Sequence, residues 1–111
     1  MTRQFVELNL FRKSWAALGL DDDALDTLER QLLANPSAGA VMPGCGGARK
    51  VRIALPGRGK SGSGRVIYVD FILQKRINLL FSYPKNKQKN LTEEQKQYVR
   101  DMIEAIKAEE E

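Results

Sequence analysis

Apolar residues recur at helical spacing in two stretches near the N-terminus. The positions are Phe11, Trp15 and Leu18 in the first stretch and Leu25, Leu28, Leu32 and Leu33 in the second. Gly19 follows the first stretch as a stop signal, the aspartates at 21–23 suit the start of a second helix, and Asn35-Pro36 ends it. The pattern predicts a helical hairpin whose apolar stripe packs into the core.

The middle of the chain has the composition and periodicity of strands. Residues 49–55 place three apolar side chains on one face and both Lys50 and Arg52 on the other. Residues 65–73 are β-branched or aromatic almost throughout, which favours a central strand buried on both faces. Two more strands are expected at residues 3–8 and 78–83.

A last helix opens at the segment TEEQ, residues 92–95, which has the spacing of a capping box. The apolar residues between positions 99 and 106 share one face of this helix. The expected order is β-α-α-β-β-β-α. The chain is therefore predicted to be one small α+β domain over residues 1–111, with helices on one face of a mainly antiparallel sheet.

Length and composition are consistent with that domain. The chain has 111 residues, 42% of them apolar, which is enough for a single core. No apolar run approaches the roughly 18 residues that a membrane span needs, and we expect no membrane association and no secretory signal. Cys45 is the one cysteine, so no intramolecular disulfide forms, and we expect a reducing cytoplasm.

The sequence contains no histidine, which excludes several classes of enzyme. Nucleophiles activated by histidine and histidine metal sites are ruled out, and one cysteine cannot supply a thiolate zinc site. We therefore expect no metal and no cofactor. Any acid or base must be a lysine, arginine, tyrosine or carboxyl group.

The formal charge of +4 conceals a strong asymmetry along the chain. Residues 1–48 carry four cations and six carboxylates, and residues 91–111 carry three cations and seven carboxylates. Residues 49–90 carry eleven cations and one carboxylate, a formal charge of +10. A block this one-sided favours a polyanion such as nucleic acid as its partner.

Two glycine motifs in the middle segment do not have the context that their usual chemistry requires. Gly57, Gly59 and Gly62 match G-x-G-x-x-G, but a strand follows them where a dinucleotide fingerprint needs a helix. The P-loop motif is not matched either, because Ala54 occupies the position of the first glycine of that motif. What remains is a basic glycine-rich loop that carries Arg58 and Lys60.

The candidate site consists of cations with two tyrosines interleaved. The set is Arg49, Lys50, Arg52, Arg65, Lys85, Lys87 and Lys89, with Tyr68 and Tyr83. Period-two geometry aligns Lys50 with Arg52, and a neighbouring strand that begins at Arg65 brings a third cation beside them. Several cations crowded together depress the pKa of a lysine, which would supply a base without histidine.

A resemblance to a known family rests on three segments, which occur in the order NPSAGAVMPGCGGARKVRIA, PGRGKSGSGRVIY and YPKNKQKNLTEEQ. Over nearly its whole length the chain resembles the RelE/HigB-type toxins of bacterial type II toxin–antitoxin systems, and it is most similar to the HigB-like branch. The resemblance implies a compact α+β fold and an endoribonuclease that cuts mRNA inside the 70S ribosome without a cofactor. It also implies a cognate antitoxin that is HigA-like and DNA-binding.

The same resemblance assigns roles to individual positions. Lys50, Arg52, Arg65 and Lys85 correspond to the family's catalytic cations, and Lys87 competes with Lys85. RNA contacts are expected from Arg49, Arg58, Lys60, Tyr68, Tyr83, Lys87 and Lys89. The family's base-stacking tyrosine falls near Thr92 here, so that role is vacant or passes to Tyr83 or Tyr68.

The implied chemistry is transesterification without a metal. Lys85 or Lys50 takes the proton of an RNA 2′-OH, which attacks the adjacent phosphate, and the arginines at 65 and 52 stabilise the phosphorane. Two alternatives remain open: a non-catalytic RNA- or ribosome-binding protein, and a gyrase poison like the ParE toxins, which share the fold.

Overall fold

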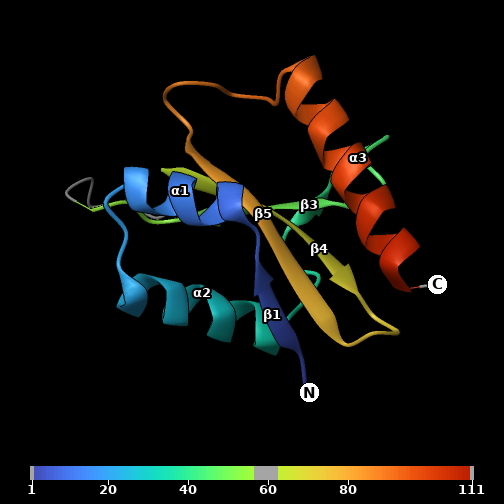
Figure 1. The fold of residues 1–111 in the computed structure, drawn as a ribbon. Helices are drawn as coiled ribbons and strands as arrows, with labels where there is room; N and C mark the ends of the chain where they lie inside the picture. Colours follow the sequence, from blue (N-terminus) through green and yellow to red (C-terminus); the bar gives the residue numbers. More distant parts are fainter. Residues whose placement is uncertain (1, 57–62, 111) are drawn as a thin grey trace.

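Five strands form one sheet in the order β1-β5-β4-β3-β2 (Figure 1). The computed structural model describes residues 2–56 and 63–110. The elements are β1 (Gln4–Glu7), α1 (Asn9–Ala17), α2 (Asp22–Ala34), β2 (Ala40–Val41), β3 (Arg49–Ile53), β4 (Gly64–Phe71), β5 (Arg76–Pro84) and α3 (Glu93–Glu110). The mixed α+β class is confirmed, and β4 is the central strand, as its composition predicted.

The sheet differs from the expected one at both edges. At one edge β1 pairs with β5 in parallel, from Gln4 opposite Arg76 to Glu7 opposite Leu79. At the other edge the two residues of β2 pair with the start of β3, in a segment for which no strand was expected. Strands β3, β4 and β5 are antiparallel to one another as predicted. The seven-element order therefore gains one short strand.

The helices cover both faces of the sheet, so the expectation that they share one face is wrong. Figure 1 shows α1 and α2 on one side and α3 on the other. Val66 and Tyr68 of β4 pack in the core under α1 and α2, whereas Ile67 and Val69 pack in the core under α3. Because β4 is apolar on both faces, each face needs its own cover.

The helix boundaries follow the predicted signals. The Asp21 carboxylate accepts a hydrogen bond from the backbone N–H of Ala24 (2.9 Å) at the start of α2. Before α3, the N–H of Gln95 donates to Oγ1 of Thr92 (3.1 Å), and the N–H of Thr92 donates to Oε1 of Gln95 (3.0 Å). These two reciprocal bonds confirm the capping box. No helix in the described part of the chain is both long and apolar enough to cross a bilayer.

Candidate nucleic-acid site

A row of three polar side chains crosses β3, β4 and β5 on the face that carries α3. Arg52 pairs with Arg65, and Arg65 pairs with Tyr83. Directly opposed residues on one face of a sheet have Cβ atoms about 4.5–5.5 Å apart, so these side chains are neighbours. We call this set, Arg52, Arg65 and Tyr83, the cation row.

Arg65 is the buried member of the cation row. Its side chain is held within the sheet surface with the residue only 8% exposed, and its Nη1 donates a hydrogen bond to the carbonyl of Gly64 (2.9 Å). A guanidinium fixed in this way loses little freedom when it binds an anion, and it presents a planar set of donors. Burial and this hydrogen bond therefore hold the Arg65 side chain in a fixed position on the sheet.

Tyr83 is also buried, at 5% exposure, and its hydroxyl makes no hydrogen bond with any described residue. Burial raises the pKa of Tyr83, and the positive charge of Arg65 offsets part of that effect. The phenol therefore stays protonated at neutral pH and is a hydrogen-bond donor beside the guanidinium. A phosphate oxygen bound to Arg65 would satisfy it.

Two sets of lysines flank the cation row on opposite sides. Lys50, half-buried, lies on the same face of β3 two residues before Arg52, which is about 6.8 Å along the strand. On the other side, the backbone N–H of Lys85 donates to the carbonyl of Ser63 (2.9 Å), two residues before Arg65. Lys50 and Lys85 therefore stand one register row away from Arg65 in opposite directions.

The loop after β5 carries the remaining lysines. Lys85, Lys87 and Lys89 are exposed, and with Ser63 they line a hollow of about 540 Å³. The N–H of Lys87 donates to the carbonyl of Pro84 (3.2 Å), which holds the loop close to the strand end. Sequence reasoning missed Ser63, because only strand pairing brings it to Lys85.

Two expected RNA-binding residues lie on the face of the sheet opposite the cation row. Tyr68 is 0% exposed, its hydroxyl donates to the carbonyl of Pro36 (2.7 Å) and accepts from the N–H of Gly39 (3.0 Å), and burial raises its pKa. Arg49 Nη1 donates to the carbonyl of Gly39 (2.8 Å). Both hold the loop before β2, on the face of the sheet opposite the cation row. Side chains alternate between the two faces along a strand, so residues an odd number of positions apart lie on opposite faces. Arg49 is one position from Lys50 on β3, and Tyr68 is three positions from Arg65 on β4.

The remaining predicted residues are placed as follows. Arg58 and Lys60, with the glycine motif around them, lie outside the described residues. Cys45 is buried as a free thiol in the core under α3. Across residues 2–56 and 63–110, no group of three histidine, cysteine, aspartate or glutamate side chains gathers as a metal site.

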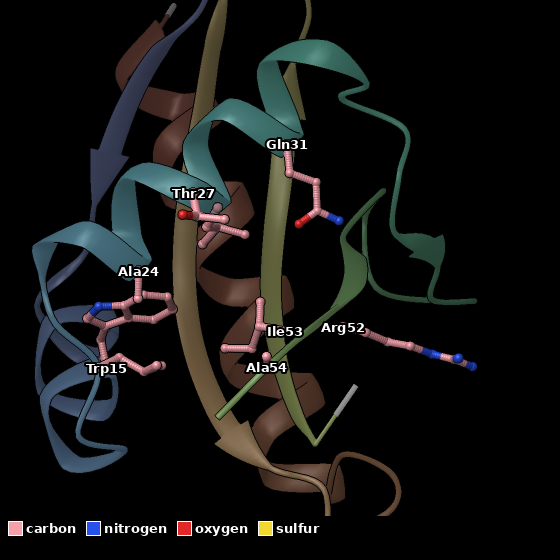
Figure 2. Close-up of a pocket in the computed structure, with 9 residues that line it drawn as sticks. Trp15, Ala24, Thr27, Gln31, Arg52, Ile53 and Ala54 are labelled. Carbon is pink, nitrogen blue, oxygen red and sulfur yellow. The ribbon is translucent and has the colours of Figure 1, made fainter. Parts of the chain in front are cut away.

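A second groove, not expected from the sequence, lies between α2 and β3 on the opposite side of the sheet. Figure 2 shows Trp15 and Ala24 facing Ile53 and Ala54 across it, and its volume is about 490 Å³. Arg52 borders the groove, but Figure 2 shows its side chain pointing away from the two helices. Its guanidinium therefore belongs with the cation row.

Comparison with known proteins adds a family and a fold. Residues 17–111 match the family model described as the RelE toxin of the RelE / RelB toxin-antitoxin system. Among solved structures, the chain is similar to a doubly substituted mutant of the E. coli toxin RelE in the free state, with a TM-score of 0.55 and 14% sequence identity. That similarity covers 80% of this chain and 90% of the other. At this identity the structural likeness concerns the fold alone.

Proposed function

The chain belongs to the RelE toxin family, and from this premise we propose that it inhibits translation by cutting mRNA within the 70S ribosome. It acts in the cytoplasm, and a cognate antitoxin, HigA-like and DNA-binding, holds it inactive. The sequence segments favour the HigB-like branch of the family. The observation that carries the proposal is the cation row, in which the buried Arg65 lies beside Tyr83, whose hydroxyl has no hydrogen-bond partner among the described residues.

The reaction needs only the RNA and protein side chains. A base removes the proton of the 2′-OH, the 2′ oxygen bonds to the adjacent phosphorus, and the bond from phosphorus to the 5′ oxygen breaks. A proton donor then supplies a proton to the leaving 5′ oxygen. The products are a 2′,3′-cyclic phosphate and a 5′-OH end. DNA lacks the 2′-OH and is not a substrate.

The cation row suits the charge that develops on the phosphorane. The guanidinium of Arg65 and the hydroxyl of Tyr83 are both donors, and both are positioned before the substrate arrives. Arg52, exposed at the end of the row, adds a second positive charge. Preorganised donors of this kind often make the largest contribution to catalysis.

Lys50 and Lys85 suit the two proton transfers because they lie on opposite sides of the row. In-line displacement places the attacking 2′ oxygen and the leaving 5′ oxygen on opposite sides of the phosphorus. One lysine therefore serves the 2′-OH and the other serves the 5′ oxygen. The arrangement is symmetrical enough that either lysine fits the role of base.

The decisive test replaces Arg65 by alanine. We expect Arg65→Ala to abolish growth inhibition and to slow cleavage at least about 100-fold, because it removes a buried donor to the phosphorane. Cleavage is measured by primer extension on mRNA bound to translating ribosomes. Circular dichroism checks that the variant is folded.

Arg30→Ala is the matched control, because Arg30 is an exposed helix arginine whose partner is Asp26. This variant should remain toxic. A folded Arg65→Ala protein of full toxicity would contradict the proposal. Ribosome binding by the wild-type protein without new mRNA ends would replace it with non-catalytic binding.

A further inference from the structure

Gly39 lies against the backbone of Lys50, on the face of the sheet opposite the cation row. A methyl group at this position would place its Cβ 2.9 Å from both the carbonyl carbon and the carbonyl oxygen of Lys50, and 2.9 Å from Cε1 of Tyr68. Carbon atoms in contact prefer a separation of about 3.5–4.0 Å. Any side chain at position 39 would therefore displace one of its neighbours.

Gly39 is buried and is held by side chains from two strands. Nη1 of Arg49 donates a hydrogen bond to the carbonyl of Gly39 (2.8 Å), and the hydroxyl of Tyr68 accepts one from the N–H of Gly39 (3.0 Å). Arg49 precedes Lys50 on β3, whereas Tyr68 belongs to β4. The bond from Arg49 therefore ties Gly39 to the strand that carries Lys50.

The backbone of Lys50 is also confined within the plane of the sheet. Lys50 lies opposite Ala40 of β2 on one side and opposite Ile67 of β4 on the other. Ile67 is 0% exposed, and a close-packed core yields little to a displaced neighbour. A Cβ at position 39 would therefore push Lys50 out of the plane, toward the face that carries the cation row.

The position of the Lys50 backbone determines where its amine can reach. Lys50 is one register row, about 6.8 Å along the strand, from the row that contains Arg65. We propose that Gly39 is a positioning residue, which sets the distance between the Lys50 amine and the cleaved phosphate, and that Arg49 holds Gly39 in place. This inference rests on the proposed function. A displacement of about 1 Å can slow a reaction about 100-fold, because proton transfer requires hydrogen-bond distance.

The first test replaces Gly39 by alanine. Gly39→Ala should slow single-turnover cleavage of ribosome-bound mRNA about tenfold or more, because the added Cβ moves the Lys50 amine. Affinity for a 2′-O-methyl RNA, which cannot be cleaved, should stay within about twofold of wild type, because the charge of Lys50 is kept. A folded variant that cleaves at the wild-type rate would overturn the inference. A slower variant whose RNA affinity falls by the same factor would overturn it as well.

A double-mutant cycle with Lys50 separates positioning from general damage to the site. If Gly39 acts through Lys50, Gly39→Ala has no further effect on the residual cleavage by Lys50→Ala. If Gly39→Ala slows the wild type and Lys50→Ala by the same factor, its effect does not depend on Lys50. That result would overturn the inference.

Gly19→Ala is the matched control for the loss of a glycine. Gly19 follows α1 with a φ of +76°, and a Cβ there would have no neighbour within 4 Å. The variant should lower stability in urea unfolding through backbone strain alone and leave cleavage per folded molecule unchanged. A loss of cleavage as large as that of Gly39→Ala would assign both effects to stability, against the inference.

Arg49→Gln keeps the test decisive if circular dichroism shows that Gly39→Ala does not fold. The substitution removes the donor that ties Gly39 to β3 and adds no atom against Lys50. We expect a loss of cleavage of about threefold, as for one hydrogen bond, and no further loss in the Lys50→Ala background. An equal loss in both backgrounds, or no loss in the wild type, would overturn the inference.

The two proposals fail in distinguishable ways. If the wild-type protein produces no new mRNA ends, the proposed function fails and the positioning role fails with it. If the wild-type protein and Lys50→Ala cleave at the same rate, Lys50 takes no part in the reaction. The positioning role of Gly39 is then wrong, while the nuclease stands.

Discussion

Two buried tyrosines, Tyr68 and Tyr83, have opposite hydrogen-bonding environments. The hydroxyl of Tyr68 has two backbone partners, in Pro36 and Gly39, whereas the hydroxyl of Tyr83 has none among the described residues. A buried polar group without a partner is costly to the fold. The presence of the Tyr83 hydroxyl beside Arg65 is explained if the substrate supplies its hydrogen-bond partner.

Tyr83→Phe should therefore separate activity from stability. We expect cleavage to fall about 100-fold, because one donor to the phosphorane is lost. The free energy of unfolding should stay within about 0.5 kcal/mol of wild type or rise, because no hydrogen bond is broken. The measurements are single-turnover cleavage on ribosomes and urea unfolding.

Tyr68→Phe is the control for this prediction, since it removes the same atom from the other face. It should lower stability by about 1–3 kcal/mol, because the N–H of Gly39 and the carbonyl of Pro36 lose their partner. Cleavage per folded molecule should stay near wild type. A larger loss of activity in Tyr68→Phe than in Tyr83→Phe would contradict the assignment of faces.

At the scale of the elements, the sequence predicts best what local interactions determine. The N-cap at Asp21 and the capping box at Thr92 use residues within four positions, and the structure has both. Alternation along β3 places Lys50 and Arg52 together, as predicted. The same rule, applied to Arg49 and Tyr68, would have placed both on the opposite face.

Long-range pairing could not be predicted in the same way. The two residues of β2 have no strand pattern of their own, and they form a strand because β3 offers an edge. One hollow of about 400 Å³ is lined by residues from 40–50 and from 90–96, which lie far apart in the sequence. Basic residues could be found from composition, whereas no local sequence signal indicates that these two segments meet.

The capping box of α3 makes an energetic prediction. Thr92→Ala should lower the free energy of unfolding by about 1 kcal/mol, because the N–H of Gln95 loses its acceptor. Thr27→Ala is the control, since Thr27 lies within α2 and its hydroxyl bonds only to the Asp23 carbonyl one turn earlier. That change should be near neutral. If both variants lose the same free energy of unfolding in chemical denaturation, the capping box does not stabilise the protein.

For the molecule as a whole, the charge distribution predicts a salt-dependent interaction with RNA. If Lys50, Arg52, Arg65 and Lys85 each neutralise one phosphate, the slope of log affinity against log salt is about −2.8 for single strands. Fluorescence anisotropy with a 2′-O-methyl RNA, which cannot be cleaved, measures this slope. Lys50→Ala should reduce its magnitude by about 0.7.

Lys107→Ala is the matched control, because Lys107 is exposed near the far end of α3. It should leave the slope unchanged. If both lysine variants reduce the slope equally, RNA affinity depends on the net charge of the protein and not on the position of Lys50. If the affinity does not change with salt, phosphate contacts are excluded.

All three tyrosines have a raised pKa, with burial as the largest cause. A group whose pKa is higher in the folded state contributes stability below its unfolded pKa, about 10 for tyrosine. That contribution is lost as pH rises through the folded values. We expect stability to fall above pH 10, with tyrosinate absorbance appearing together with unfolding. Tyrosinate formation at pH 10 in a protein that stays folded would contradict these directions.

The parallel pairing of β1 with β5 has a consequence for how the chain acquires its structure. Strands β3, β4 and β5 are consecutive antiparallel neighbours, whereas β1 is made first and its partner, β5, is the last strand of the described chain to be synthesised. Loop closure over so many residues is slow compared with the closing of hairpins. The first strand therefore has no partner through most of synthesis, and the sheet reaches its full width only after β5 has been made, when α3 is the one element of the described chain still to come.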